Sequence, residues 1–283
     1  MKMGSEFEAK IQTGEMLKWL LAIGLGLVIC LFTAQPGLRA SEKGGMTLDS
    51  PLTASQVVSR MVEMRDHRKE ALRSYTSLRT YHLELHGLIS LHANMEVKMT
   101  YRYPGVKDFT ILSQSGSAYV RNHVFKRILK AENLNSHQSE KRHIAITPEN
   151  YNFELTGYEQ NDQGGFYILN VTPKVKNKYL FKGRIWVDGK SFSIVRIEGQ
   201  PSETLSWWTP KVNFVYQYKK VGEFWFPASN KTITHVRIFG HSLLTIHYKD
   251  YDLTDALRVQ PLTAAKVSLS DRTPDMSLIP SQP

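Results

Sequence analysis

Residues 89–103 read Ile-Ser-Leu-His-Ala-Asn-Met-Glu-Val-Lys-Met-Thr-Tyr-Arg-Tyr, and this stretch decides the fold. Its odd positions, from Ile89 to Tyr103, are apolar or aromatic, whereas its even positions, from Ser90 to Arg102, are polar. Successive side chains of a β-strand point to opposite faces of the sheet. The period of two therefore predicts a long strand with one dry face and one wet face.

The same period continues on both sides of this stretch. Tyr81, Leu83 and Leu85 alternate with polar residues before it, and Phe109 and Ile111 continue the alternation after it. Seven further strands are predicted at 151–158, 166–172, 179–187, 192–198, 212–219, 228–239 and 242–251. The short connections and the lack of strand–helix alternation favour an antiparallel meander.

Two segments have helical rather than strand periodicity. Thr53 and Gln56 have the spacing of a capping box, and apolar residues follow at helical intervals as far as Leu72. Between residues 119 and 134, Val124 and Ile128 share one helical face, opposite a basic face. The predicted fold class is therefore mainly β (α+β), with an N-terminal amphipathic helix and a second helix.

The N-terminus has the pattern of an export signal. Residues 19–32 carry no charge, Lys18 precedes them, and Pro36 and Gly37 follow before Ala40. We expect a signal peptide over 1–40, cleaved near Ala40, with translation starting at Met16; an uncleaved anchor is the alternative, although the apolar run is short for one. Residues 41–52 are then a linker, 53–252 the folded domain and 253–283 a disordered, proline-containing tail.

Composition excludes several classes of protein. With 22% charged and 11% aromatic residues the chain is neither disordered throughout nor collagen-like. Its one cysteine, Cys30, lies in the signal segment, so the exported protein has no disulfide and no Cys-based zinc site. The formal net charge of +10 suits an anionic surface or simple solubility. The sequence carries no nucleic-acid-binding motif, so we expect no nucleic-acid partner.

Several of these features together resemble the LolA-like superfamily of outer-membrane lipoprotein carriers and sorting proteins. They are the signal peptide, the amphipathic helix, the long strand ending at Tyr103-Pro104-Gly105, and the segments 166–174, 183–188 and 225–227. The resemblance covers about residues 53–252. It implies a strongly curved antiparallel sheet, a half-open barrel, whose concave face is covered by helices and receives acyl chains. It also implies a basic residue that holds a helical lid, for which Arg102 and Lys107 are the nearest candidates.

On this resemblance the protein is a periplasmic, non-enzymatic carrier for lipid-modified proteins or other amphiphiles, without a cofactor. It would make transient contact with a membrane surface or a membrane protein. An envelope-stress sensor of the same fold and an envelope enzyme with an unrecognised site are the alternatives. The expected ligand-binding residues are Leu83, Leu85, Ile89, Leu91, Met95, Val97, Met99, Tyr101, Phe153, Leu155, Leu169, Val171, Phe214, Tyr216, Leu244 and Ile246.

Each of these interpretations has a simpler alternative. A stripe of methionine and aromatic residues on a strand face is also typical of an ordinary filled core, and periodicity does not separate the two. Trp207 and Trp208 suit a cavity mouth or a partner contact, but they equally suit the end of a core. The basic run between Lys174 and Arg184 suits an anionic membrane or a solvated face.

Motifs for catalysis or metal binding are weak or missing. His82, Glu84 and His86 share one strand face, but their spacing of about 7 Å along the strand and their place on the wet face argue against a metal site. No nucleophile elbow, phosphate-binding loop or dinucleotide fingerprint is present in the sequence. We therefore expect no metal and no catalytic residues.

Overall fold

The computed structural model of the chain describes residues 52–88, 90–134, 143–161, 164–238 and 240–253. The expected signal peptide, nearly all of the linker and tail, and Ile89 lie outside the described residues. Helix α3 (Ala54–Ala71) begins the described part. The π-helical turn η1 (Val120–Phe125) leads directly into α4 (Lys126–Leu134), where the sequence predicts its second helix.

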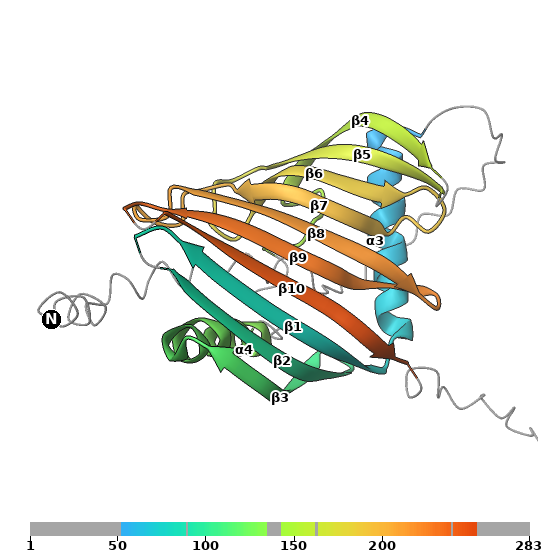
Figure 1. The fold of residues 1–283 in the computed structure, drawn as a ribbon. Coiled ribbons are helices and arrows are strands. Elements are labelled where there is room, and N and C mark those ends of the chain that lie inside the picture. The colour runs from blue at the N-terminus through green and yellow to red at the C-terminus, as the bar shows by residue number, and fades with distance from the viewer. Residues whose placement is uncertain (1–51, 89, 135–142, 162–163, 239, 254–283) are drawn as a thin grey trace, which may run out of the picture.

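Ten strands form one antiparallel sheet in the order β3-β2-β1-β10-β9-β8-β7-β6-β5-β4. The sheet is long and curved, and α3 runs across its strands (Figure 1). This architecture confirms the predicted fold class. The strands are β1 (Ser74–His86), β2 (Leu91–Arg102), β3 (Val106–Gly116), β4 (Tyr151–Asn161), β5 (Gly164–Pro173), β6 (Phe181–Asp188), β7 (Ile194–Pro201), β8 (Lys211–Val221), β9 (Phe224–Val236) and β10 (Gly240–Asp252).

The alternation in the deciding stretch is confirmed in β2. Its odd residues from Ala93 to Tyr101 are buried, while Lys98 and Arg102 on the other face are exposed. The alternation continues into β3, where the register pairs Ile111 with buried Val97, but the Ile111 side chain is exposed. Strand β3 lies at the edge of the sheet, so its inward-facing side chains are covered less completely.

Both helices pack on the same face of the sheet. Register places Phe214 and Leu244 opposite the same residue of β9, Thr232, so their side chains share one face. Helix α3 covers the cluster that contains Phe214, and η1 and α4 cover the cluster that contains Leu244. We call these regions the α3 half and the α4 half. Buried polar residues of β9, Asn230, Thr232 and Thr234, lie between them.

The start of α3 follows the predicted capping box. The Thr53 hydroxyl accepts a hydrogen bond from the Gln56 amide at 3.3 Å, and the Gln56 side chain accepts one from the Thr53 amide at 2.9 Å. Val57, Val58 and Met61 on the next turns are buried against β5, β6 and β8. Local capping and apolar packing thus fix α3 to the sheet.

Candidate ligand-binding site

Three charged residues occupy positions where the fold requires apolar side chains. Arg79 of β1 is in phase with buried Tyr81, and Lys107 of β3 is in phase with Phe109. Glu132 of α4 lies one helical turn after buried Ile128. All three are buried, with 3%, 5% and 6% of their surface exposed. The curvature of the sheet and the packing of α4 bring them together as one ionic cluster.

Glu132 lies at the centre of this ionic cluster. Its two carboxylate oxygens accept hydrogen bonds from Arg79 Nη1 at 3.0 and 2.8 Å, and Oε1 also accepts one from Lys107 Nζ at 2.8 Å. The Arg79 guanidinium also lies 5.2 Å from the ring centre of Tyr248. Two cations against one anion leave the cluster with an excess of one positive charge. These bonds are the polar link between α4 and the sheet.

The pKa values follow from this geometry. Burial alone would raise the pKa of Glu132, but the attraction of Arg79 and Lys107 outweighs it and lowers the pKa to about 2. Burial lowers the pKa of Lys107 against the opposing attraction of Glu132. Burial also disfavours the charged form of Arg79, but the attraction of Glu132 outweighs burial and keeps the pKa of Arg79 well above its usual value. Glu132 is therefore ionised throughout the physiological range.

A small cavity adjoins the ionic cluster. Its volume is about 40 Å³, enough for a few water molecules but far below the roughly 300–1,000 Å³ of a typical ligand pocket. A cavity of this size does not hold an acyl chain. The lining is mostly aromatic and polar: Tyr75, Arg79, Glu132, Tyr216, Gln217, Tyr218, Pro227, Ser229, Asn230, Tyr248 and Tyr251.

The expected ligand-binding residues separate into three clusters. In the α4 half, Leu83, Leu91, Met95, Val97, Leu244 and Ile246 pack with η1 and α4. In the α3 half, Phe153, Leu155, Leu169, Val171, Phe214 and Tyr216 pack under α3. Met99 and Tyr101 belong to a third cluster with Tyr75 and Phe226. Leu85 is half-buried near the end of β1. Among the expected residues, only Tyr216 lines the cavity.

The four residues expected at a cavity mouth have different surroundings. Trp207 is exposed, whereas Trp208 packs against the core cluster of the α4 half. Arg102 is exposed and forms an ion pair with Asp108. Lys107 is not at a mouth: it is buried, because its position on β3 faces inward toward Glu132. Its ammonium group donates to the Glu132 carboxylate of helix α4.

Arg79 and Glu132 are functional candidates that the sequence analysis missed. A signal for both was present in the sequence. Arg79 breaks the apolar phase of Tyr81 and Leu83, and Glu132 breaks the four-residue spacing of Val124 and Ile128. A charge at a buried position is rare unless it is paired. Two such violations of opposite sign therefore predict one buried contact.

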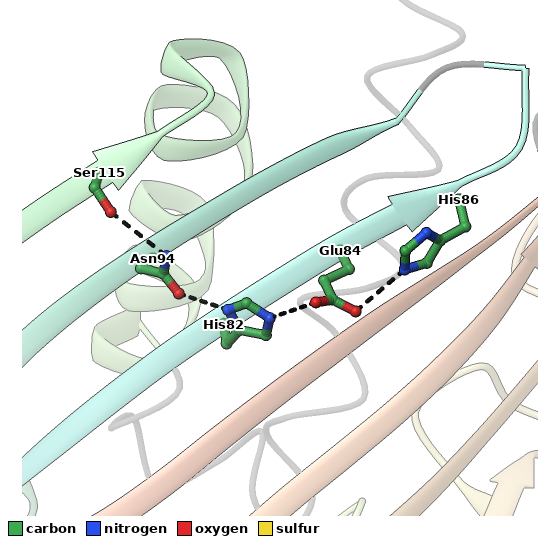
Figure 2. A network of polar contacts seen from close by, with 5 residues as sticks. All are labelled: His82, Glu84, His86, Asn94 and Ser115. Carbon is green, nitrogen blue, oxygen red and sulfur yellow. Dashed lines mark hydrogen bonds and ion pairs between the residues drawn. The ribbon is translucent and has the colours of Figure 1, made fainter.

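A second polar network lies on the outer face of the sheet, opposite α4. Figure 2 shows Glu84 between His82 and His86, with contacts of 2.9 and 3.1 Å, and His82 bonded in turn to Asn94. Hydrogen bonds to Asn94 and Glu84 raise the pKa of His82. Within the described residues no group of three or more His, Cys, Asp or Glu side chains is arranged to hold a metal ion.

One family of known sequences matches part of the chain. The sequence profile of a family of unknown function, DUF5686, matches residues 146–251. No curated protein sequence matches the chain. In the described part of the chain, no helix has both the length and the apolar character that a membrane span requires.

Solved structures of low sequence identity are similar to the chain. A LolA superfamily protein from Nitrosomonas europaea is 12% identical, with 72% of this chain and 96% of that one covered and a TM-score of 0.34. A DUF1329 family protein from Desulfovibrio piger is 13% identical, with 70% and 92% covered and a TM-score of 0.36. A domain proposed to sort outer-membrane lipoproteins, from Vibrio parahaemolyticus, is 11% identical, with 69% and 92% covered and a TM-score of 0.34.

Proposed function

We propose that the protein is an exported, non-enzymatic carrier or binding protein that holds the acyl chain of a lipid-modified protein, or of another amphiphile. In this proposal the acyl chain of the ligand is inserted between helix α4 and the inner face of the sheet in the α4 half. The observation that carries the proposal is the buried ionic cluster. Helix α4 packs Ile128 and Leu129 into the core of its half, but one turn after Ile128 it buries the charged Glu132 against Arg79 and Lys107, where a permanent core would have a further apolar side chain.

The energetics of the ionic cluster suit a helix that can be displaced. A buried ion pair contributes little net stability compared with apolar packing, because its members lose their hydration. Separation of Glu132 from its partners costs about 3–5 kcal/mol if the charges stay buried, and less if they regain water. Burial of an acyl chain contributes about 0.8 kcal/mol per methylene. About six methylenes therefore offset the separation of Glu132 from its two cations. Further methylenes replace the apolar contacts that Ile128 and Leu129 lose when the helix leaves the sheet.

Displacement of α4 would also create a place for the polar end of the ligand. Arg79 and Lys107 would lose their shared carboxylate and face the space that α4 leaves. Both can donate hydrogen bonds to a phosphate, carboxylate or ester oxygen. The apolar side chains that line the same space, among them Met95, Val97 and Leu244, would contact the acyl chain.

The test is uptake of a fluorescent palmitoylated peptide by the delipidated protein. Wild type should bind it, and the same peptide without the acyl chain should not bind. Glu132→Gln should take up the acylated peptide faster, because a neutral amide binds the two cations less strongly. Identical affinity of the wild type for the two peptides would overturn the proposal.

Glu198→Gln is the matched control variant. Glu198 also bonds two arginines, Arg184 at 3.1 Å and Arg196, but it lies on a strand of the α3 half and points away from the inner face. Its substitution should leave uptake unchanged. Equal acceleration in the two variants would show that the effect is unrelated to α4.

A further inference from the structure

One end of the sheet is built differently from the other. In this antiparallel sheet all odd-numbered strands run in one direction, so β1, β5, β7 and β9 end at the same side, at the left in Figure 1. The described residues of the loops that follow these strands are 87–88, 90, 174–180, 202–210 and 237–238. We call them the tip loops. Adjacent strands are about 4.8 Å apart, so the tip loops extend along a rim of about 30 Å.

Each tip loop carries one strongly exposed apolar side chain. They are Leu88, Ile238, Val175 and Trp207, with 74%, 66%, 62% and 61% of their surface exposed, and they are the four most exposed large apolar residues in the described part of the chain. Hairpin turns normally carry Gly, Asn, Asp or Ser. The turns at the opposite end follow that rule, with Asp188-Gly189 and Gly222-Glu223 as examples.

The tip loops are also cationic. Lys174, Lys176, Lys178 and Arg237 are exposed, and none of them forms an ion pair within the described residues. Glu203 is the one acidic residue in the sequence of these loops. Isolated exposed apolar residues are normal on a protein surface. Here they instead coincide with a local excess of positive charge.

Hydrogen bonds connect neighbouring tip loops. The Ser202 hydroxyl donates to the Asn177 carbonyl at 2.7 Å, which joins loops 174–180 and 202–210. The Arg237 amide donates to the Trp208 carbonyl at 2.9 Å, and its guanidinium lies 4.6 Å from the ring centre of Trp207. These bonds hold the apolar and cationic groups in place before any partner binds, which reduces the entropy cost of binding.

The geometry points to a docking surface for an anionic lipid bilayer, formed by the tip loops. Trp207, Leu88, Ile238 and Val175 insert into the interfacial region, where tryptophan is favoured. The four cations contact lipid phosphates. This inference concerns another part of the molecule than the ligand site and does not depend on it.

The arrangement of the tips favours a bilayer over a protein partner. A protein groove or patch binds a contiguous apolar surface, whereas these side chains stand on separate loops along a rim. A bilayer accepts separate apolar side chains at one depth and presents negative charge to the cations between them. Four single side chains support reversible binding, since even a full myristoyl chain alone binds only marginally.

The test uses the protein as recovered after export and measures co-flotation with vesicles of phosphatidylcholine, alone or with 30% phosphatidylglycerol. Wild type should bind the anionic vesicles more strongly. Trp207→Ser should weaken this binding about tenfold, and the quadruple variant with Leu88→Ser, Val175→Ser, Trp207→Ser and Ile238→Ser should weaken it more than a hundredfold. Lys174→Gln, Lys176→Gln and Lys178→Gln should each cost about fivefold on anionic vesicles only.

The matched control removes equally accessible apolar side chains elsewhere. Leu112 and Tyr158 are each 53% exposed and lie on the edge strands β3 and β4. Leu112→Ser with Tyr158→Ser should leave flotation unchanged, and thermal melting should be the same for all variants because every altered side chain is exposed. Equal loss of binding in this control, or failure of the wild type to bind either vesicle, would overturn the proposal. If the wild type binds neither vesicle, and a protein co-purifies with the wild type but not with the quadruple variant, the tip loops bind a protein partner instead.

Discussion

The two halves of the inner face are covered by helices in different ways. Helix α3 presents Val57, Val58 and Met61 to the sheet and bonds at its C-terminal end to a loop, where Arg68 donates to the Ser191 carbonyl at 2.7 Å. Helix α4 also contributes Ile128 and Leu129 to the core, but in addition it buries Glu132 against two cations beside a cavity. Apolar packing gives α3 the character of permanent core. The ionic contact gives α4 a bond that can be exchanged for water or for a ligand, which is why the proposed ligand site lies in the α4 half.

The largest loss of stability should come from disruption of the ionic cluster. Glu132→Ala leaves Arg79 and Lys107 buried without their carboxylate, and we expect a loss of about 4 kcal/mol in the free energy of unfolding. Urea titration measures it. Lys130→Ala on the exposed side of the same helix should cost less than about 0.5 kcal/mol. A loss below 1 kcal/mol for Glu132→Ala would mean that α4 is held by something else.

A substitution that creates a cavity under α3 should reduce stability slightly less than Glu132→Ala does, and it should not change uptake. Met61 is 3% exposed, and Met61→Ala should cost about 3 kcal/mol. Met64→Ala, at a side chain that is 36% exposed, should cost much less. Uptake of the palmitoylated peptide should be the same in both variants. Faster uptake by Met61→Ala would remove the distinction between the two halves.

Acid should loosen the α4 half first. The pKa of Glu132 is lowered in the folded protein to about 2 from its ordinary 4.5. The stabilisation is therefore complete above pH 4.5 and is lost as the pH falls toward 2, with about 2 kcal/mol gone by pH 3. The difference between urea midpoints at pH 5 and pH 3 should shrink in Glu132→Gln. An unchanged difference would show that other carboxylates cause the acid response.

Loss of the N-terminal cap of α3 should reduce stability less than the substitutions above. Thr53→Ala removes the hydroxyl that accepts a hydrogen bond from the Gln56 amide but keeps the backbone amide that donates to the Gln56 side chain, and it should cost about 1 kcal/mol. Ser55→Ala, on the exposed side of the first turn, is the control and should be neutral or slightly stabilising. Thermal melting distinguishes the two variants. Equal melting temperatures would mean that the cap is dispensable because packing alone holds α3.

The smallest effect on stability should come from the polar network on the outer face of the sheet. The pKa of His82 is raised above 6.5 by Asn94 and Glu84, so its contribution to stability is complete below 6.5 and is lost as the pH rises through the folded-state value. Asn94→Ala should lower that pKa in an NMR titration. The stability of the α3 half and of the α4 half should not change, and uptake of the palmitoylated peptide should stay as in wild type. A change in uptake would connect the outer network to α4.

The sequence predicts the sheet far better than the site. Alternation in residues 89–103 identifies the dry face of β2, and the capping box places the start of α3 within a residue, because local backbone chemistry determines both. The pairing of β1 with β10 depends on contacts between residues about 160 positions apart, such as Leu83 with Leu244, which no local pattern contains. Ile111 is exposed although the register pairs it with buried Val97, because β3 is an edge strand, and period counting does not identify the edge of a sheet.

The site is predictable only in part for the same reason. Arg79 and Glu132 violate the periodicity of their own elements, so each can be recognised as unusual from the sequence. That they meet depends on where α4 packs. The size of the cavity depends on how the side chains of five elements fill the space around it, and alternation is the same for a filled and an open interior.

Hydrogen exchange followed by mass spectrometry, with and without a palmitoylated peptide, tests the central claim most directly. Binding of the acylated peptide should increase amide exchange in residues 120–134, because η1 and α4 separate from the sheet, and should leave residues 54–71 of α3 unchanged. The unacylated peptide should change neither segment. Increased exchange in α3, or bound acylated peptide with unchanged exchange in both helices, would contradict the account.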